Sequence, residues 1–317
     1  MNGLSKVSAS WLEIDESADG QRIDNFLVKT LKGVPRSHVY RILRSGEVRV
    51  NSGRIRASYR LQTGDRVRVP PVRVSAVPAG RPSSGTAPIG QFPLFEDDWL
   101  LAIDKPAGVA VHGGSGISMG VIERLRSERP DQSFLELVHR LDRETSGVLL
   151  LAKRRSALTN VHSQLREGRT QKLYRTLVLG QWSEKSRSVR LPLRKYVSGG
   201  GERRVVVDED DGAVAITVFK LVGSFNGFSL LEAQLKTGRT HQIRVHLAHL
   251  GFPIAGDDKY GDFPANKALE KQGLKRMFLH AVSLKLKHPG SGELLHIQAP
   301  LPRELTRFLE SKNLEST

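Results

Sequence analysis

The sequence predicts an α+β protein in which a small N-terminal domain precedes a larger domain built on a mixed or mostly antiparallel sheet. The chain has 317 residues, a length at which one large domain and one small domain are expected. Residues 72–91 are rich in Pro, Gly, Ala and Ser, a composition typical of a linker. The two domains then span residues 11–71 and 92–317, and residues 1–10 form a flexible tail.

The N-terminal domain carries both helical and strand signals. Apolar residues at positions i, i+3, i+4 and i+8 predict a helix over residues 23–31. Pro35 suits the start of a second helix, and Gly46 suits its C-terminal cap. Alternating valines predict short strands at 48–50 and 67–69, with a turn after the first. These elements describe a small α+β domain.

Strand-like runs dominate the larger domain and alternate with a few helical stretches. The clearest runs are residues 99–103, 148–152, 173–179, 214–221 and 229–235. They lack the regular spacing of βαβ units, which favours an α+β domain over a parallel α/β sheet.

Positive charge points to a polyanionic partner. The net charge is +16, and the first 90 residues hold 15 Lys and Arg against 7 Asp and Glu. Such a field attracts nucleic acid by charge and by counterion release. A membrane surface is less favoured because no basic amphipathic helix with aromatic anchors is visible. The candidate RNA-binding residues of the N-terminal domain are Arg36, Arg41, Arg44, Arg49 and Arg54.

Several classes of protein and site are disfavoured by what the sequence lacks. There is no cysteine, so a disulfide, a thiolate nucleophile and a thiolate zinc site are excluded. The first residues do not resemble a signal peptide, and the apolar runs are too short to span a bilayer. We expect a cytoplasmic protein with no metal and no membrane partner. The absence of heptads predicts a monomer.

Asp142 is the strongest catalytic candidate on residue chemistry alone. If residues 139–142 are extended, Arg140 and Asp142 share a face, and the guanidinium stabilises the carboxylate. An aspartate has an ordinary pKa of about 3.9 and needs no partner base to act as a nucleophile. Retaining glycosidases use such a carboxylate but need a second one about 5 Å away, and none is evident. A structural salt bridge between Arg140 and Asp142 is the alternative.

Three other patterns are weaker. His241, His246 and His249 lack a glutamate at zincin spacing. Residues 145–147 lack the first glycine of a nucleophile elbow, which argues against a serine hydrolase. Residues 105–108 lack the spacing of a phosphate-binding loop and its Lys-Ser/Thr ending.

The N-terminal domain resembles the ribosomal-protein-S-four type of RNA-binding domain over about 60 residues. The resembling residues are Arg22-x-Asp24-x-Phe26-Leu27, Ser37…Ile42…Gly46-x-Val48-x-Val50-Asn51 and Gly64-Asp65. The alternative to RNA binding is that these arginines only keep the surface of a small domain soluble.

The larger domain resembles the RluA-type pseudouridine synthases. One block of this domain is similar to the active-site signature of that family: His139-Arg140-Leu141-Asp142-x-x-Thr145-Ser146-Gly147. Further blocks follow the family order: Asp104-Lys105-Pro106-x-Gly108…His112, Lys172-x-Tyr174, Thr237-Gly238-Arg239-Thr240-His241-Gln242-Ile243-Arg244-x-His246, Asp258-x-Tyr260-Gly261 and Leu279-His280-Ala281. The match spans about residues 95–302.

This resemblance implies a pseudouridine-synthase-like catalytic domain that isomerises uridines in large-subunit ribosomal RNA without cofactor, metal or ATP. Asp142 would attack a flipped-out uridine, at the anomeric carbon or through a glycal route. Tyr174 would stack on the base, with removal of a sugar proton as a second implied role, and Arg244 would pair with Asp142. A core tyrosine and a plain surface arginine are the alternatives for these two residues.

The resemblance also implies RNA contacts beside the nucleophile. Arg140 matches the residue that occupies the position vacated by the uridine, and Lys105 and Lys172 are further candidates for RNA binding. The competing functions are a transfer-RNA pseudouridine synthase, a non-catalytic RNA-binding ribosome assembly factor and a base-releasing glycosylase. Which uridines are modified is not encoded in any readable base code.

Overall fold

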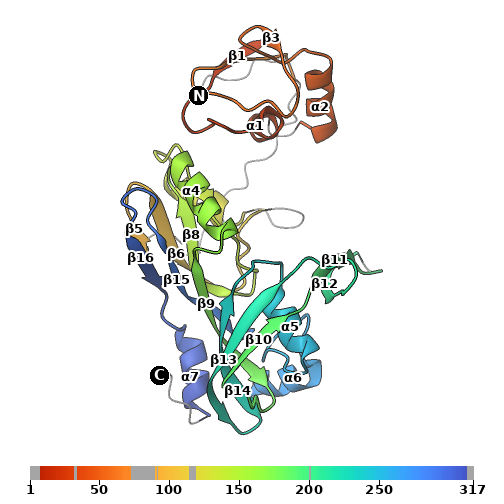
Figure 1. The fold of residues 1–317 in the computed structure, drawn as a ribbon, viewed down its shortest axis with the longest axis vertical. Coiled ribbons are helices and arrows are strands. Elements are labelled where there is room, and N and C mark those ends of the chain that lie inside the picture. The colour runs from red at the N-terminus through yellow and green to blue at the C-terminus, as the bar shows by residue number, and fades with distance from the viewer. Residues whose placement is uncertain are drawn as a thin grey trace. The chain divides into compact units, whose positions relative to one another are not determined.

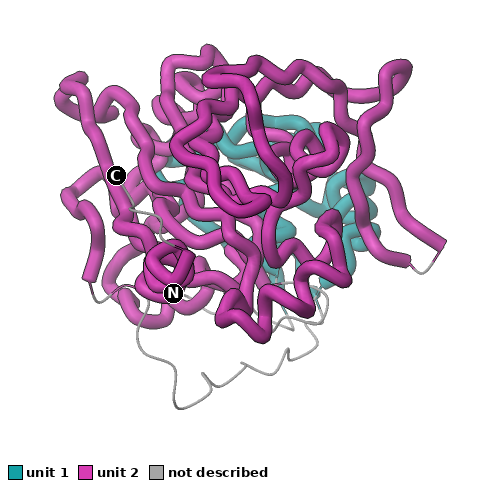
Figure 2. The backbone as a smooth tube through the Cα atoms, turned by 90° about the horizontal axis from the view of Figure 1, so that it is seen from below, with its two compact units in different colours: residues 1–84 teal, residues 85–317 magenta. Residues whose placement is uncertain are grey.

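The chain forms two compact units, residues 1–84 and 85–317, which Figure 2 distinguishes by colour. The computed structural model describes residues 8–31, 34–72, 90, 92–113, 119–199 and 201–312. The predicted tail and most of the predicted linker lie outside the described residues, so the domain boundaries stay predictions. The first strand already begins at Ser10, within the predicted tail.

The first unit is a four-stranded antiparallel sheet with two helices (Figure 1). The strand order is β1 (Ser10–Glu13), β4 (Arg66–Val69), β2 (Arg49–Val50) and β3 (Gly53–Arg54). The helices are α1 (Ile23–Thr30) and α2 (Arg36–Arg44), and their predicted apolar residues lie in the core of this unit. Gly46 has a positive φ of 75° just after α2, as its predicted capping role requires.

The second unit is built on a ten-stranded mixed sheet, as the α+β prediction expected. β8 and β15 pair in parallel, and the other pairs of this sheet are antiparallel. The strands are β5 (Phe95–Glu96), β6 (Leu100–Lys105), β7 (Glu136–Leu137), β8 (Ser146–Ala152), β9 (Gln171–Leu179), β10 (Ser186–Arg190), β13 (Ile216–Phe225), β14 (Phe228–Leu235), β15 (Leu279–Lys287) and β16 (Leu294–Gln298).

Helices cover both faces of this sheet because its central strands are apolar on both sides. On β8, Leu149 and Leu151 share a core with α3, while Val148 and Leu150 share another with α4. On β9 the same alternation places Tyr174 in the core that includes α5, and the opposite face contacts α6 and α7. The helices are α3 (Val121–Glu128), α4 (Arg155–Arg166), α5 (Gln242–His249), α6 (Phe263–Lys271) and α7 (Arg303–Glu310).

A separate hairpin, β11 (Leu193–Val197) and β12 (Arg203–Val207), projects from the second unit beside α5 (Figure 1). The sequence analysis did not predict it. In the described part of the chain, no helix combines the length and apolar character needed to cross a membrane.

The parallel contact between β8 and β15 requires glycine at position 147. Gly147 has a φ of 108°, and a Cβ atom there would overlap the carbonyl group of Ala281 on β15. Glycine therefore permits the close approach of the two strands at the point where β8 begins. The close contact of the two strands fixes the position of the loop that precedes β8, and this loop carries Asp142.

Candidate active site

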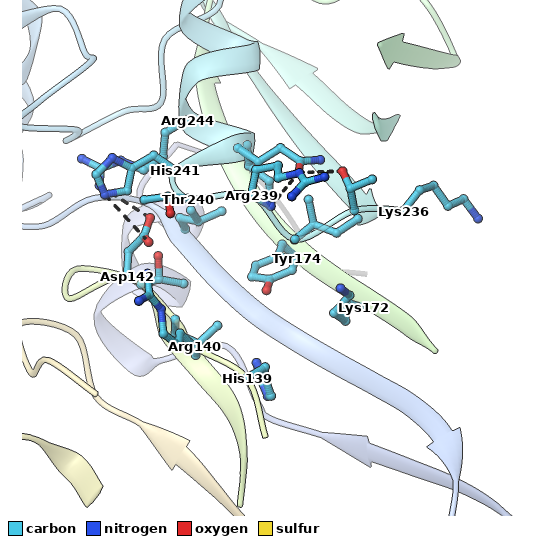
Figure 3. Close-up of a pocket in the computed structure, with 18 of the residues that line it drawn as sticks. His139, Arg140, Asp142, Lys172, Tyr174, Lys236, Arg239, Thr240, His241 and Arg244 are labelled. Atoms are coloured by element: carbon cyan, nitrogen blue, oxygen red, sulfur yellow. Dashed lines mark hydrogen bonds and ion pairs between the residues drawn. The ribbon is translucent and has the colours of Figure 1, made fainter. Parts of the chain in front are cut away.

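One pocket of about 530 Å³ brings together all three predicted catalytic residues, Asp142, Tyr174 and Arg244 (Figure 3). The loop before β8 contributes Arg140 and Asp142, and β9 contributes Lys172 and Tyr174. Arg244, on the first turn of α5, completes the set. Three segments that are far apart in the sequence therefore meet at one site.

Asp142 lies in the loop between β7 and β8, where residues 140–142 belong to no helix or strand and a turn follows at residues 143–144. The backbone N–H of Thr145 donates to the carbonyl of Asp142 at 3.2 Å. His139 anchors the start of the loop, because its Nε2 accepts the backbone N–H of Leu150 at 3.1 Å. Burial lowers the pKa of His139 to about 4, so the imidazole is neutral and able to accept this bond.

Arg244, not Arg140, is the guanidinium beside the Asp142 carboxylate. Arg244 Nη1 lies 3.6 Å from Asp142 Oδ2, and the side chain of Asp142 is 25% exposed. Within the described part of the chain, the exposed side chain of Arg140 forms no hydrogen bond or ion pair. The structure thus corrects the proposed Arg140–Asp142 salt bridge and leaves Arg140 available for a ligand.

Asp257 holds Arg244 in place and was missed by the sequence analysis. Arg244 Nε and Nη2 donate to the two carboxylate oxygens of Asp257 at 2.8 and 2.7 Å, and both side chains are buried. Burial opposes ionisation of Asp257, but the hydrogen bonds and charge of Arg244 outweigh it and lower the pKa of this carboxyl. The motif quoted above began one residue later, at Asp258, whose side chain is 75% exposed.

Tyr174 is a buried residue on β9 that belongs to the core and also lines the pocket. Burial raises the pKa of its phenol, and the charge of Asp142 raises it further. The phenol is therefore protonated at neutral pH. Lys172, two residues earlier on the same face of the strand, also lines the pocket, and burial lowers the pKa of its amine.

Positive side chains surround the single carboxylate of the pocket. Among the described residues that line it, Asp142 is the only acidic one. The lysines and arginines that line it are Arg140, Arg166, Lys172, Lys236, Arg239 and Arg244. The sequence analysis did not assign a role to Arg166, Lys236 or Arg239. Arg239 belongs to one of the motifs quoted above, and its place in that motif was the only sequence feature that could have indicated a role in the pocket.

The prediction that Lys105 contacts RNA is corrected by its burial. Lys105 is fully buried at the end of β6, and its ammonium donates to the carbonyls of Pro106, Val109 and Arg143 at 2.8, 2.8 and 3.0 Å. Burial lowers the pKa of this amine to about 7. Lys105 therefore joins its own loop to the turn that carries Asp142 and presents no charge to a ligand.

The predicted RNA-binding arginines of the first unit lie on one helix and one hairpin. α2 carries Arg36, Arg41 and Arg44, and the β2–β3 hairpin carries Arg49 and Arg54; all five are exposed. Arg49 and Arg54 donate to nearby backbone carbonyls, which orders their side chains. These five residues keep a basic surface that nothing in the described part of the first unit covers.

Two of the three histidines that suggested a metal are engaged by protein groups, and the third, His249, is exposed on α5. His246 is buried between the carbonyl of Leu191 and the hydroxyl of Thr217, both at 3.1 Å. His241 Nδ1 lies 2.8 Å from the hydroxyl of Tyr260. Across the residues that the structure describes, no three His, Cys, Asp or Glu side chains are arranged to hold a metal ion.

Comparison with known proteins identifies the class to which this fold and pocket belong. The family model described as RNA pseudouridylate synthase matches residues 99–249, and the S4 domain model matches residues 21–67. A human structure, RNA Pseudouridylate Synthase Domain Containing 4, aligns with a TM-score of 0.59 at 28% identity, covering 72% of this chain and 95% of that one.

Curated relatives extend this similarity over nearly the whole chain. The ribosomal large subunit pseudouridine synthase C of Pasteurella multocida is 53% identical over 94% of this chain and 92% of its own length. The protein of the same name from Escherichia coli K12 is 52% identical over 92% of each chain. The chain therefore belongs to the RNA pseudouridylate synthase family and is an RNA pseudouridine synthase.

Proposed function

We propose that this enzyme converts uridines of large-subunit ribosomal RNA to pseudouridine, with Asp142 as the nucleophile. The names of the relatives support the substrate, since both are described as acting on the ribosomal large subunit. One observation carries the assignment of the nucleophile. Asp142 is the only carboxylate among the described lining residues of a cationic pocket, 3.6 Å from a buried arginine that is itself held by Asp257.

The proposed reaction exchanges one glycosidic bond for another. The Asp142 carboxylate bonds to C1′ of the sugar while the C1′–N1 bond breaks, and uracil leaves with the electron pair. The base then turns, and its C5 bonds to C1′ and displaces the carboxylate. C5 loses a proton and N1 gains one, so the product is an isomer and no electron is gained or lost. In the glycal alternative the sugar C2′ proton leaves and later returns.

The other pocket residues have roles that fit this chemistry. The uridine must leave its stack, at a cost of a few kcal/mol. Tyr174 offers a protonated phenol ring on which the base stacks, and Arg140 offers to the vacated position and to phosphates a planar cation that has no partner among the described residues. Arg244 compensates the charge of Asp142 before and after the sugar is bound.

The test of the nucleophile compares Asp142→Asn with Asp258→Asn. Asp258 lies 3.4 Å from the same arginine but is absent from the pocket lining, so it controls for charge near Arg244. We expect Asp142→Asn to form no detectable pseudouridine while binding RNA nearly as well as the wild type. Asp258→Asn should remain active. Pseudouridine formation by Asp142→Asn would refute the assignment.

The test of the substrate maps pseudouridine in RNA from a deletion strain. Loss of specific sites in large-subunit ribosomal RNA, restored by the wild type and not by Asp142→Asn, is the expected result. Loss of pseudouridine confined to transfer RNA would identify transfer RNA as the substrate instead. Complementation by Asp142→Asn would favour a non-catalytic assembly factor, and free uracil in the reaction would favour a glycosylase.

A further inference from the structure

His241 lies at the pocket beside Asp142 in a strained backbone conformation (Figure 3). It immediately precedes α5 and has a φ of 52°, in the left-handed region. For a residue other than glycine this conformation costs about 1–3 kcal/mol, so the surrounding structure must enforce it. The result is that His241 Nε2 lies 3.9 Å from Asp142 Oδ1.

The hydrogen bonds of Tyr260 determine which nitrogen of His241 carries the proton. The hydroxyl oxygen of Tyr260 accepts the backbone N–H of Val205 at 3.0 Å and lies 2.8 Å from His241 Nδ1. If the hydroxyl proton is donated to Nδ1, both bonds are satisfied at once. The neutral imidazole then carries its proton on Nε2, the nitrogen that faces Asp142. The opposite tautomer would leave the hydroxyl proton without a partner among the described residues.

Tyr260 is itself fixed from several directions. Its backbone N–H donates to Asp257 Oδ1 at 2.9 Å, and its ring meets the His241 ring edge-on, with centroids 5.4 Å apart. The guanidinium of Arg244 lies 5.1 Å from the centroid of the Tyr260 ring. Tyr260 therefore joins β12, Asp257 and Arg244 to the imidazole, so that His241 has little freedom to turn.

We propose that His241, with its tautomer set by Tyr260, is a positioning residue that orients the Asp142 carboxylate by presenting Nε2–H to Oδ1. This rests on the proposed role of Asp142 as the nucleophile. Arg244 faces Oδ2 at 3.6 Å and His241 faces Oδ1 at 3.9 Å, so the carboxylate lies between two donors. Both distances exceed a hydrogen bond of about 2.7–3.2 Å, which leaves the oxygen lone pairs available for the sugar carbon.

A neutral donor suits this position better than a second cation. Burial lowers the pKa of His241, Arg244 and Lys259 lower it further, and Asp142 and Asp257 act in the opposite direction. The imidazole is therefore uncharged at neutral pH. It aligns the carboxylate by a dipole without forming a full ion pair, and it neither gives up nor takes a proton during the reaction.

The kinetic test uses three substitutions in the full chain. The amide nitrogen of glutamine lies near the position of imidazole Nε2, so His241→Gln keeps the donor and His241→Ala removes it. We expect His241→Ala to lower the single-turnover rate by about tenfold to a hundredfold with RNA affinity unchanged, because a small misplacement of reacting atoms costs this much. His241→Gln should recover most of the rate. His249→Ala, at the exposed last residue of α5, is the matched control.

Two results would overturn the proposal on kinetic grounds. One is a His241→Ala enzyme as fast as the wild type, while Asp142→Asn is inactive; the other is equal loss in His241→Ala and His241→Gln. If Asp142→Asn remains active, the proposed nucleophile fails instead, so the two failures are distinguishable.

The structural test reads the tautomer directly and does not depend on activity. In ¹⁵N-histidine-labelled protein, the ring signals absent from His241→Ala identify His241. We expect the Nε2–H tautomer in the wild type and a mixture of tautomers in Tyr260→Phe, which lacks the hydroxyl. A wild-type imidazole protonated on Nδ1 would contradict the proposal, whatever the stability of Tyr260→Phe. An unchanged tautomer in folded Tyr260→Phe would also contradict it.

Discussion

The buried pair of Arg244 and Asp257 predicts a measurable coupling between stability and the active site. Asp257 accepts two bonds from Arg244 and two backbone N–H groups, from Lys259 and Tyr260 at 2.8 and 2.9 Å. Asp257→Asn removes the charge but keeps an oxygen for the two backbone donors. Arg244→Met removes the other half of the pair with little change in volume.

The expected magnitudes follow from the burial of both side chains. Removing one partner of a buried ion pair costs about 3–5 kcal/mol, because the other charge stays buried and uncompensated. For Asp257→Asn we expect about 3 kcal/mol, at the low end of that range, since Asp142 and Asp258 remain at 3.6 and 3.4 Å from Arg244. The double variant should cost about 1–3 kcal/mol less than the sum of the single variants.

The assay is urea unfolding at pH 7, followed by tryptophan fluorescence in a Trp11→Phe background. Trp11 belongs to the first unit, so only Trp99 and Trp182 of the second unit then report. The pKa of Asp257 is lowered in the folded state, so its contribution is present above the unfolded pKa of about 3.9 and is lost as the pH falls through the folded pKa. The difference between wild type and Asp257→Asn should therefore shrink in acid.

Two outcomes would refute this reasoning. If the free-energy losses of the single variants simply add, the pair is not coupled. If Asp257→Asn costs less than about 1 kcal/mol, the guanidinium is compensated by water or by its other neighbours, as for an exposed ion pair.

Three further predictions concern residues around the site and on the RNA-binding unit. Lys105→Met should lower the turnover number more than it raises KM, because the carbonyl of Arg143, beside Asp142, loses its hydrogen-bond donor. Burial lowers the pKa of Lys105 to about 7, so the stability of the wild type relative to this variant should rise from pH 7 towards 10. Urea titrations at both pH values measure this difference. Gly147→Ala should destabilise the second unit by about 3 kcal/mol in the same unfolding assay, through overlap with Ala281 and backbone strain. Replacing Arg36 and Arg44 by alanine should weaken RNA binding at low salt and reduce the slope of log K against log salt by about 1–2, with the single-turnover rate unchanged at saturating enzyme.

Periodicity and motif content predicted the parts of the molecule that depend on local sequence. The apolar spacing over residues 23–31 anticipated α1, and the run at 173–179 anticipated most of β9. Tyr174 and Asp142, which the structure places in one pocket, could be proposed as site residues because each stands in an ordered block of residues. Each of these signals lies within a few neighbouring positions of the sequence, so it can be recognised without knowing the tertiary contacts.

The parts that could not be predicted depend on contacts between distant segments. Asp257 reaches Arg244 only because the loop after α5 turns back along that helix, and no pattern around position 257 encodes this. Lys105 was assigned to RNA by its charge, yet three carbonyl groups from two loops enclose its amine. The sequence names a residue type, but the direction of its side chain is set by packing.

The charge arrangement of the pocket supports a base that leaves and returns over one that is released. A retaining glycosidase places a second carboxylate about 5 Å from the nucleophile to protonate the leaving group. Among the described lining residues no second carboxylate is present, and Glu144, the nearest acidic neighbour of Asp142 in the sequence, lies outside that lining. Arginine and lysine side chains surround the proposed nucleophile instead. An arginine guanidinium would stabilise an anionic base by its charge without protonating it for release. A uracil anion held there keeps the electron density at C5 that the new carbon–carbon bond requires.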